Sequence, residues 1–159
     1  MRAWELDLKV ARQMVSINWE GFLNGLSIVI PRMMAAKAGG IALVSSVAGY
    51  RGLPNALVYG PTKAALINLA ETLYVDLKDK GLDVYVINPG FVKTPMTAQN
   101  EFEMPFLIEP EEAAQEIAKG FESGEFEIHF PKAFTRMLKT MRHLSYPLYF
   151  KTVKKFTKL

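Results

Sequence analysis

Residues 41–63 decide the fold, because the run Ile41-Ala-Leu-Val44 ends in two serines and leads to Tyr59-Gly-Pro-Thr-Lys63. A short, wholly apolar run is typical of a strand that is covered on both faces, as in a parallel sheet. The pattern from Tyr59 to Lys80 is helical, and Leu82-Asp-Val-Tyr-Val-Ile87 is a second strand. Strand, helix and strand in this order imply a right-handed crossover, so the sequence predicts an α/β fold.

Outward from this unit, the chain adds more helices and one more strand. Apolar positions at helical spacing predict a long helix over residues 6–37, which Gly39-Gly40 should end, and Gly81 should cap the helix that starts at Tyr59. A shorter helix is expected to run from Pro110 to about Phe121, and Phe126-Glu-Ile-His-Phe130 alternates as a strand does. We therefore expect a partial, doubly wound parallel sheet of about three strands with long flanking helices.

Charge divides the chain into two parts. The sequence has 19 Lys and Arg against 16 Asp and Glu, but residues 131–159 hold eight of the bases and no acid. We expect an acidic body over residues 1–130 and a basic tail over residues 131–159, which forms one or two amphipathic helices split by Pro147. Because the body is acidic, the sequence does not favour nucleic-acid binding.

Composition narrows the class of protein further. The 159 residues suit one domain with a hydrophobic core, and half of them are apolar. The chain has no cysteine, so it can form neither a disulfide framework nor a thiolate metal site. The first residues include acids where a signal peptide has an apolar run, and no segment is as apolar as a membrane span. We expect a cytoplasmic protein without a metal site.

Four polar side chains stand where they can meet at one edge of this sheet. Ser46 follows the first strand, Tyr59 and Lys63 begin the next helix, and Asn18 lies in the long helix before them. Residues four apart on a helix share a face, and ligands bind beyond the carboxyl ends of parallel strands. The Lys63 ammonium should lower the pKa of the Tyr59 phenol and make it a general acid–base. Ser46 would then hold the substrate oxygen, and Asn18 would place a water that connects Lys63 to solvent.

These residues resemble the catalytic tetrad of the short-chain dehydrogenase/reductases, whose Asn, Ser, Tyr and Lys match Asn18, Ser46, Tyr59 and Lys63 in order and spacing. The resemblance covers about residues 5–130. It implies a Rossmann-like fold and an oxidoreductase that uses NAD or NADP to interconvert a ketone or aldehyde and an alcohol. It also implies a homo-oligomer in which the two long helices pair into a four-helix interface.

A second segment, Asn88-Pro-Gly-Phe-Val-Lys-Thr94, resembles the family's nicotinamide-binding stretch. The resemblance implies that Pro89, Gly90, the backbone near Val92 and the Thr94 hydroxyl bind the cofactor, together with Tyr59 and Lys63, which would bond the ribose.

The chain departs from the family in one respect. The family begins with a strand and a glycine-rich turn that binds the pyrophosphate on a helix N-terminus, and no such loop precedes Tyr59 here. We therefore expect the C-terminal half of such an enzyme, and the residue that selects NAD or NADP cannot be read. The alternative is a truncated, non-catalytic dimerisation or interaction module, in which the unpaired edge of the strand at 41–44 binds another chain.

Two features of the sequence, the basic tail and the Met and Phe residues of 91–108, carry two interpretations each. The basic tail fits either an anionic membrane surface, which it would contact peripherally, or a helix packed on the substrate cleft. Met and Phe residues of 91–108 fit either a substrate lid or ordinary packing. His129 is expected to be a structural histidine, and Ser45 a strand-end hydrogen-bonding residue. Gly21 and Gly25 are spaced like a close-packing pair in a dimer interface.

Overall fold

A parallel sheet of three strands forms the centre of the computed structural model, which describes residues 1–99 and 104–157. The strands are β1 (Gly40–Val44), β2 (Asp83–Pro89) and β3 (Glu127–Phe130), hydrogen-bonded in the order β1-β2-β3. Gly40 pairs with Asp83, and Val86 pairs with Glu127. The predicted α/β class, parallel pairing and three strands are confirmed.

The expected long N-terminal helix is present, but it is not uniform. It consists of α1 (Leu8–Val15), a π-helical turn (Ser16–Glu20) and α2 (Gly21–Ala36). It ends at Lys37, as predicted, but Lys37 itself takes the left-handed capping conformation, with φ 51°, that the prediction assigned to the glycines after it. Gly40 instead begins β1. The Asp7 carboxylate caps the other end by accepting from the backbone of α1.

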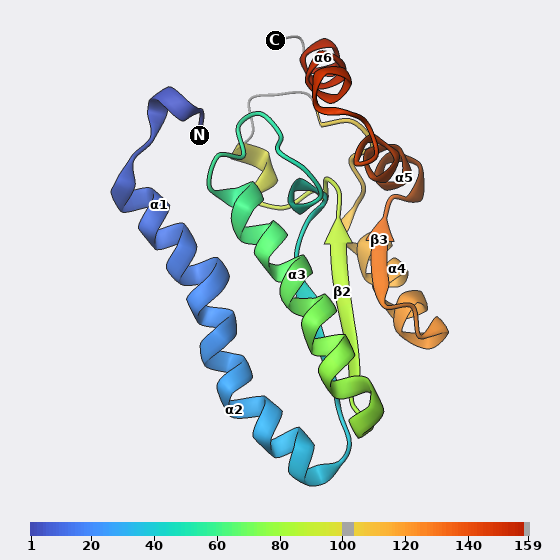
Figure 1. The fold of residues 1–159 in the computed structure, drawn as a ribbon. Coiled ribbons are helices and arrows are strands. Elements are labelled where there is room, and N and C mark those ends of the chain that lie inside the picture. The colour runs from blue at the N-terminus through green and yellow to red at the C-terminus, as the bar shows by residue number, and fades with distance from the viewer. Residues whose placement is uncertain (100–103, 158–159) are drawn as a thin grey trace.

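Helix α3 (Tyr59–Leu77) packs against the sheet and carries most of the core on that side. Ala70 and Leu73 are buried in the core cluster that α3 forms with β1 and β2. A short 3-10 turn follows α3, and Gly81 ends it with φ 84°, as the sequence predicts. Figure 1 shows α1 and α2 running alongside α3 on the face away from α4.

Helix α4 (Pro110–Ser123) covers the opposite face near β2 and β3. Pro110 and the acids Glu111 and Glu112 lie in its first turn, as expected for a helix start. A Cβ on Gly120 would stand 2.5 Å from the Ile128 side chain, so glycine is what allows α4 to approach β3.

The basic tail forms two helices, α5 (Lys132–Met141) and α6 (Tyr146–Phe156), and Pro147 lies in the first turn of α6. In Figure 1 both helices lie at the end of the molecule toward which the strand arrows point. The remaining short elements are 3-10 turns at Ala3–Glu5, Val47–Gly49, Lys78–Lys80 and Thr97–Gln99. None of the helices within the described ranges is long and apolar enough to span a bilayer.

Candidate active site

The turn after β1 holds Ser46 close to helix α3. The Ser46 hydroxyl accepts a hydrogen bond from the Ala48 backbone at 3.1 Å and so caps the 3-10 turn Val47–Gly49. A Cβ on Gly49 would stand 2.7 Å from the carbonyl carbon of Lys63. The turn can therefore lie against the backbone of α3 only because residue 49 has no side chain.

Ser46, Tyr59 and Lys63 are brought together by this packing. The Ser46 hydroxyl lies close enough to the Tyr59 phenol to counter part of the rise in the phenol pKa. The Lys63 ammonium lies 5.6 Å from the centroid of the Tyr59 ring and donates a 2.9 Å hydrogen bond to the Val44 carbonyl. Three of the four side chains that the sequence singles out thus form one cluster at the carboxyl edge of the sheet.

The electrostatics of this cluster differ from the sequence-based expectation. Burial raises the pKa of Tyr59, and the nearby Ser46 hydroxyl opposes this shift without reversing it. Burial also lowers the pKa of Lys63, whose side chain is 9% exposed. The prediction of a Tyr59 pKa below its ordinary value is therefore wrong for this structure, because desolvation of the phenolate outweighs its stabilisation.

Asn18 reaches the cluster indirectly. It lies in the π-helical turn between α1 and α2, and its side-chain amide donates to the Thr62 hydroxyl at 3.2 Å. That hydroxyl in turn donates to the Tyr59 carbonyl at 2.8 Å. Asn18 is thus linked to the first turn of α3 beside Lys63, through a threonine that the sequence did not single out. Such π turns recur at functional sites.

The segment after β2 runs along the same edge of the sheet. Pro89 ends β2, and Gly90 donates its backbone N–H to the Phe130 carbonyl at 2.7 Å. Val92 pairs with Ile108 in a parallel bridge. The Thr94 hydroxyl accepts from the Thr97 backbone at 3.3 Å, so in this structure it stabilises its own turn.

Thr97 is a structural residue that sequence reasoning missed. Its hydroxyl donates to the Val92 carbonyl at 2.7 Å and accepts from the Thr94 backbone at 2.9 Å. It therefore fixes the turn over residues 92–97, which the resemblance assigns to cofactor binding. A Thr three residues after another Thr was the available signal.

A network around Glu127 was also missed. Its carboxylate accepts from the Tyr50 phenol at 2.6 Å and from the Asn88 side-chain amide at 2.9 Å. Its other oxygen accepts from Lys139 of α5 at 2.5 Å. Tyr50 follows the Ser46 turn and Asn88 precedes Pro89, so Glu127 ties both site segments to the C-terminal helices. Nothing local in the sequence signals a bond between residues so far apart.

Three secondary predictions can be compared with the structure. The Ser45 hydroxyl donates to the Lys63 carbonyl at 2.7 Å, which confirms its role as a strand-end hydrogen-bonding residue. The His129 Nδ1 lies 2.6 Å from the buried Thr135 hydroxyl, as a structural histidine would. Phe91 and Phe106 stack on Phe134 of α5, which supports packing for these two rings.

Two other Met and Phe residues of 91–108 give no such support for packing. Met96 is 68% exposed, and Phe102 lies outside the described residues.

A Cβ on Gly25 would meet no other atom within 4 Å in the part of the chain that the structure describes, so the close-packing role of Gly21 and Gly25 stays a prediction.

The side chains at this edge fit the nicotinamide–ribose end of a dinucleotide. An ammonium has three donors, and within the described ranges the Lys63 ammonium uses one, on Val44, so donors remain for ribose hydroxyls. The buried Asn88 Oδ1 has no hydrogen-bond partner among the described residues, which marks an unused acceptor near Pro89. The fit is limited to this end, because no glycine-rich phosphate loop precedes the site in the sequence.

Comparisons with known proteins agree with this arrangement. The family model for short chain dehydrogenase matches residues 2–104. An uncharacterized oxidoreductase from Myxococcus xanthus is 40% identical over 142 residues, which cover 87% of this chain and 56% of the relative. A 3-oxoacyl-[acyl-carrier-protein] reductase from Thermotoga maritima is 32% identical over 113 residues, which cover 65% of this chain and 46% of the relative. The chain thus spans about half the length of these relatives.

Solved structures show the same fold. A 3-oxoacyl-[acyl-carrier protein] reductase from Brucella melitensis superposes with a TM-score of 0.70 at 27% identity, covering 82% of this chain and 55% of that one. A short chain dehydrogenase from Burkholderia cenocepacia, solved in complex with NADP, gives a TM-score of 0.78 at 24% identity and covers 88% of this chain and 59% of that one. With the family model matching well over half of its residues, the chain belongs to the short-chain dehydrogenase/reductase family.

Proposed function

We propose that this chain carries the catalytic part of an NAD(P)-dependent oxidoreductase that interconverts a ketone or aldehyde and an alcohol. The observation that supports this most directly is the cluster of Tyr59, Lys63 and Ser46 at the carboxyl edge of a parallel sheet. On this proposal the chain corresponds to the C-terminal half of longer relatives, and the cofactor is NAD or NADP.

Tyr59 is the proton donor or acceptor in this proposal. Because burial holds the phenol pKa above its ordinary value, the group is protonated at neutral pH and is ready to donate to a carbonyl oxygen. Ser46 donates a hydrogen bond to the same oxygen and orients it. When bound, the cofactor supplies the hydride.

The remaining residues hold the reactants. Lys63 bonds the ribose hydroxyls of the cofactor, and Asn18 fixes the first turn of α3 through Thr62 and serves the water relay. The backbone near Val92 and the Thr94 hydroxyl bind the carboxamide, and Pro89 and Gly90 belong to the same cofactor-binding segment. Thr94 would have to exchange its bond with Thr97 for one with the ligand.

Replacement of Tyr59 by Phe tests this assignment. The variant should lose ketone-dependent oxidation of NADH or NADPH, followed by the absorbance of the reduced cofactor, by at least about a hundredfold, because only the proton donor is removed. Circular dichroism should be unchanged, and the affinity for the reduced cofactor, measured by fluorescence titration, should fall far less than turnover, because Tyr59 supplies only one of several cofactor contacts. Full turnover in Tyr59→Phe would remove this residue from the acid–base role.

A second candidate function is a non-catalytic interaction module. In the described parts of the chain, β1 has a partner strand on the β2 side alone, and Val44 is 47% exposed. A free edge with an apolar face favours pairing with another chain. A folded chain that binds neither NADH nor NADPH, but gains strand signal with a partner, would favour the module over the enzyme.

We also propose a homo-oligomer that pairs through the two long helical segments, α1–α2 and α3. Exposed apolar side chains on them support this, including Ile17, Ile28 and Val75. A cytoplasmic location, the absence of nucleic-acid partners and the division at residue 130 stay predictions.

A further inference from the structure

Helix α6 presents a basic and apolar face to solvent. Large apolar side chains on it remain exposed, namely Tyr146 (69%), Leu148 (49%), Phe150 (56%) and Phe156 (65%). Lysines alternate with them at helical spacing: Lys151 follows Leu148 by three residues, and Lys154 follows Phe150 by four. Tyr146 and Phe150 stack with their centroids 5.8 Å apart. We call the exposed set Leu148, Phe150, Lys151, Lys154 and Lys155 the outer face of α6.

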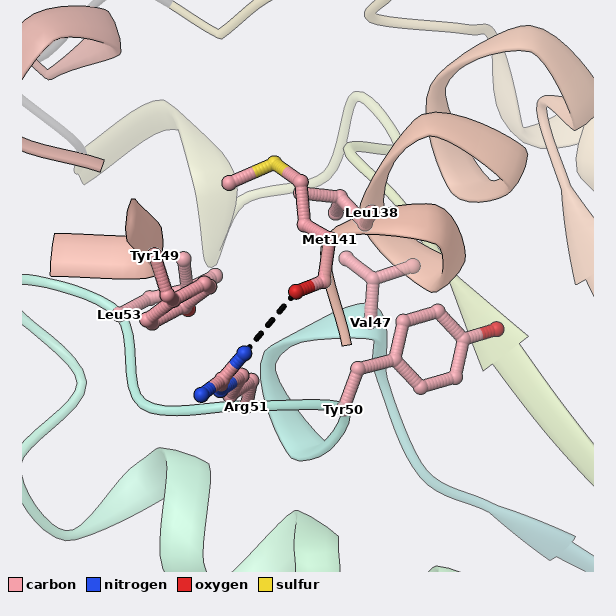
Figure 2. A pocket seen from close by; sticks show the side chains of 7 residues that line it. All are labelled: Val47, Tyr50, Arg51, Leu53, Leu138, Met141 and Tyr149. Carbon is pink, nitrogen blue, oxygen red and sulfur yellow. Dashed lines mark hydrogen bonds between the residues drawn. The ribbon is translucent and has the colours of Figure 1, made fainter. Parts of the chain in front are cut away.

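The inner side of α6 is firmly attached to the body. Tyr149 and Val153 are buried, and the Tyr149 phenol donates to the Gly52 carbonyl at 2.8 Å. The Arg51 guanidinium lies 3.9 Å from the centroid of the Tyr149 ring and donates to the Met141 and Leu144 carbonyls at the end of α5. Figure 2 shows Arg51 between the Tyr149 ring and Met141, and the dashed line marks its bond to the Met141 carbonyl.

This attachment leaves little room for a ligand beneath the helix. The cavity lined by these residues, including Val47 and Leu138, has a volume of about 10 Å³. Such a space holds a single water at most. The inner side of α6 is therefore packed against the body of the chain, and only its outer side is left for a partner.

The positive charge of the tail indicates which kind of partner the outer face of α6 binds. Residues 131–159 contain eight Lys and Arg and no acid, whereas the rest of the chain is acidic. Exposed aromatic and leucine side chains between lysines match the boundary layer of an anionic bilayer, where apolar groups enter the acyl region and ammonium groups meet lipid phosphates. The concentration of Lys and Arg without any acid in the tail therefore favours an anionic surface as the partner of this face.

We propose that the outer face of α6 binds the surface of an anionic membrane. Figure 1 places α6 at the end of the molecule where the strands terminate, beside the loop over residues 50–58 that joins Ser46 to Tyr59. Membrane binding therefore brings the candidate site to the bilayer. The substrate class that follows, and that rests on the proposed function, is a lipophilic ketone or alcohol dissolved in the membrane.

Vesicle sedimentation tests the membrane proposal without any assay of activity. The purified chain is mixed with two kinds of vesicle, one of phosphatidylcholine alone and one that also contains roughly 30% phosphatidylglycerol. The second kind has a negative surface potential. We expect binding to the anionic vesicles alone, weakened by added salt. Equal binding to both vesicle types, or none to either, would overturn the proposal.

Two pairs of substitutions localise the binding. Lys151→Glu/Lys155→Glu changes the outer face, and binding should fall at least roughly tenfold, because each basic residue near the surface contributes about a fivefold factor. Arg32→Glu/Lys80→Glu makes the same change in net charge on exposed residues of α2 and of the turn after α3, and should bind like the parent. Equal losses in the two pairs would mean that net charge alone drives binding, and would overturn the role of α6.

A third variant, Phe150→Ser, separates a membrane from a protein partner. It should weaken vesicle binding while leaving the measured mass of the chain in solution unchanged. Loss of an oligomer without any effect on vesicles would show that this face joins copies of the chain, and would contradict the proposal. The substrate class fails separately if membrane binding holds but an added lipophilic ketone is turned over no faster with vesicles than without.

Discussion

At the scale of single residues, Gly49 sets the distance between the Ser46 turn and helix α3. A Cβ at this position would stand 2.7 Å from the Lys63 carbonyl carbon and 2.8 Å from the Ala64 nitrogen. Both are backbone atoms of a helix, so neither can rotate away. Any side chain at residue 49 must therefore push the turn, and Ser46 with it, away from Tyr59.

Replacement of Gly49 by Ala should lower the free energy of unfolding by about 1–3 kcal/mol, as overpacking of a tight contact does. Urea unfolding followed by circular dichroism measures this. Gly52→Ala is the matched control, since no atom lies within 4 Å of a Cβ there, and its stability should stay near that of the parent. Equal stability in both variants would show that the close approach does not constrain the turn.

How far the site could be predicted from the sequence depends on the range of each contact. Tyr59 and Lys63 are one helical turn apart, so their shared face follows from helix geometry. The direction of the Tyr59 pKa shift does not follow, because it depends on how deeply the phenol is buried by distant segments. Glu127 was missed for the same reason, since its partner Asn88 is 39 residues away.

At the scale of elements, Glu127 of β3 connects the sheet to helix α5. Burial by itself would raise the pKa of this carboxyl, but hydrogen bonds from Lys139, Tyr50 and Asn88 hold it below the ordinary value of 4.5. An acid whose pKa is lowered by folding stabilises the fold above its ordinary pKa. That contribution is lost as the pH falls through the lower, folded value.

Replacement of Glu127 by Gln should therefore lower the free energy of unfolding by about 1–2 kcal/mol at pH 7, because hydrogen bonds to a charged acceptor become neutral ones. The difference from the parent should shrink as the pH falls below the ordinary carboxyl value of 4.5, which urea unfolding at several pH values would reveal. Glu125→Gln alters an exposed ion pair with Lys132 and should change little. A constant difference between Glu127→Gln and the parent at all pH values would contradict this account.

The elements themselves were largely predictable. A wholly apolar run indicated β1, a mostly apolar run indicated β2, and Gly81 ended the turn after α3 as glycine patterns indicate. The end of the long helix at residue 37 was predicted, but its cap was not, because Lys37 adopts the left-handed conformation that glycine usually supplies. The π-helical turn at Asn18 was not predicted, because the apolar spacing that indicates a helix does not distinguish a single π turn within it.

At the scale of the whole molecule, the helical side exposes apolar groups where the surface of a monomer is usually polar. Ile28 of α2 is 54% exposed and Val75 of α3 is 77% exposed. An open pocket of about 330 Å³ lies between α1 and α3, and Val15, Trp19 and Pro61 are among its lining residues. A second copy of the chain that covers this side would bury all of these groups.

Replacement of Ile28 and Val75 by Lys should convert the proposed oligomer to a monomer, because buried lysines at an interface lack partners. Light scattering coupled to size exclusion measures the mass. Met96→Lys changes a residue that is 68% exposed in the loop after β2 and should keep the parent mass. An unchanged mass in the double variant would exclude this side as the interface.

The C-terminal helices have two attachments of unlike chemistry. Arg51 donates to backbone carbonyls at and just after the end of α5, whereas Lys139 of the same helix bonds the Glu127 carboxylate, which acid can neutralise. Acidification below the lowered pKa of Glu127 should thus weaken the contact between α5 and β3 while the far end of α5 stays attached to the loop. Amide hydrogen exchange at such a pH would then quicken in β3 before it quickens at residues 141–144.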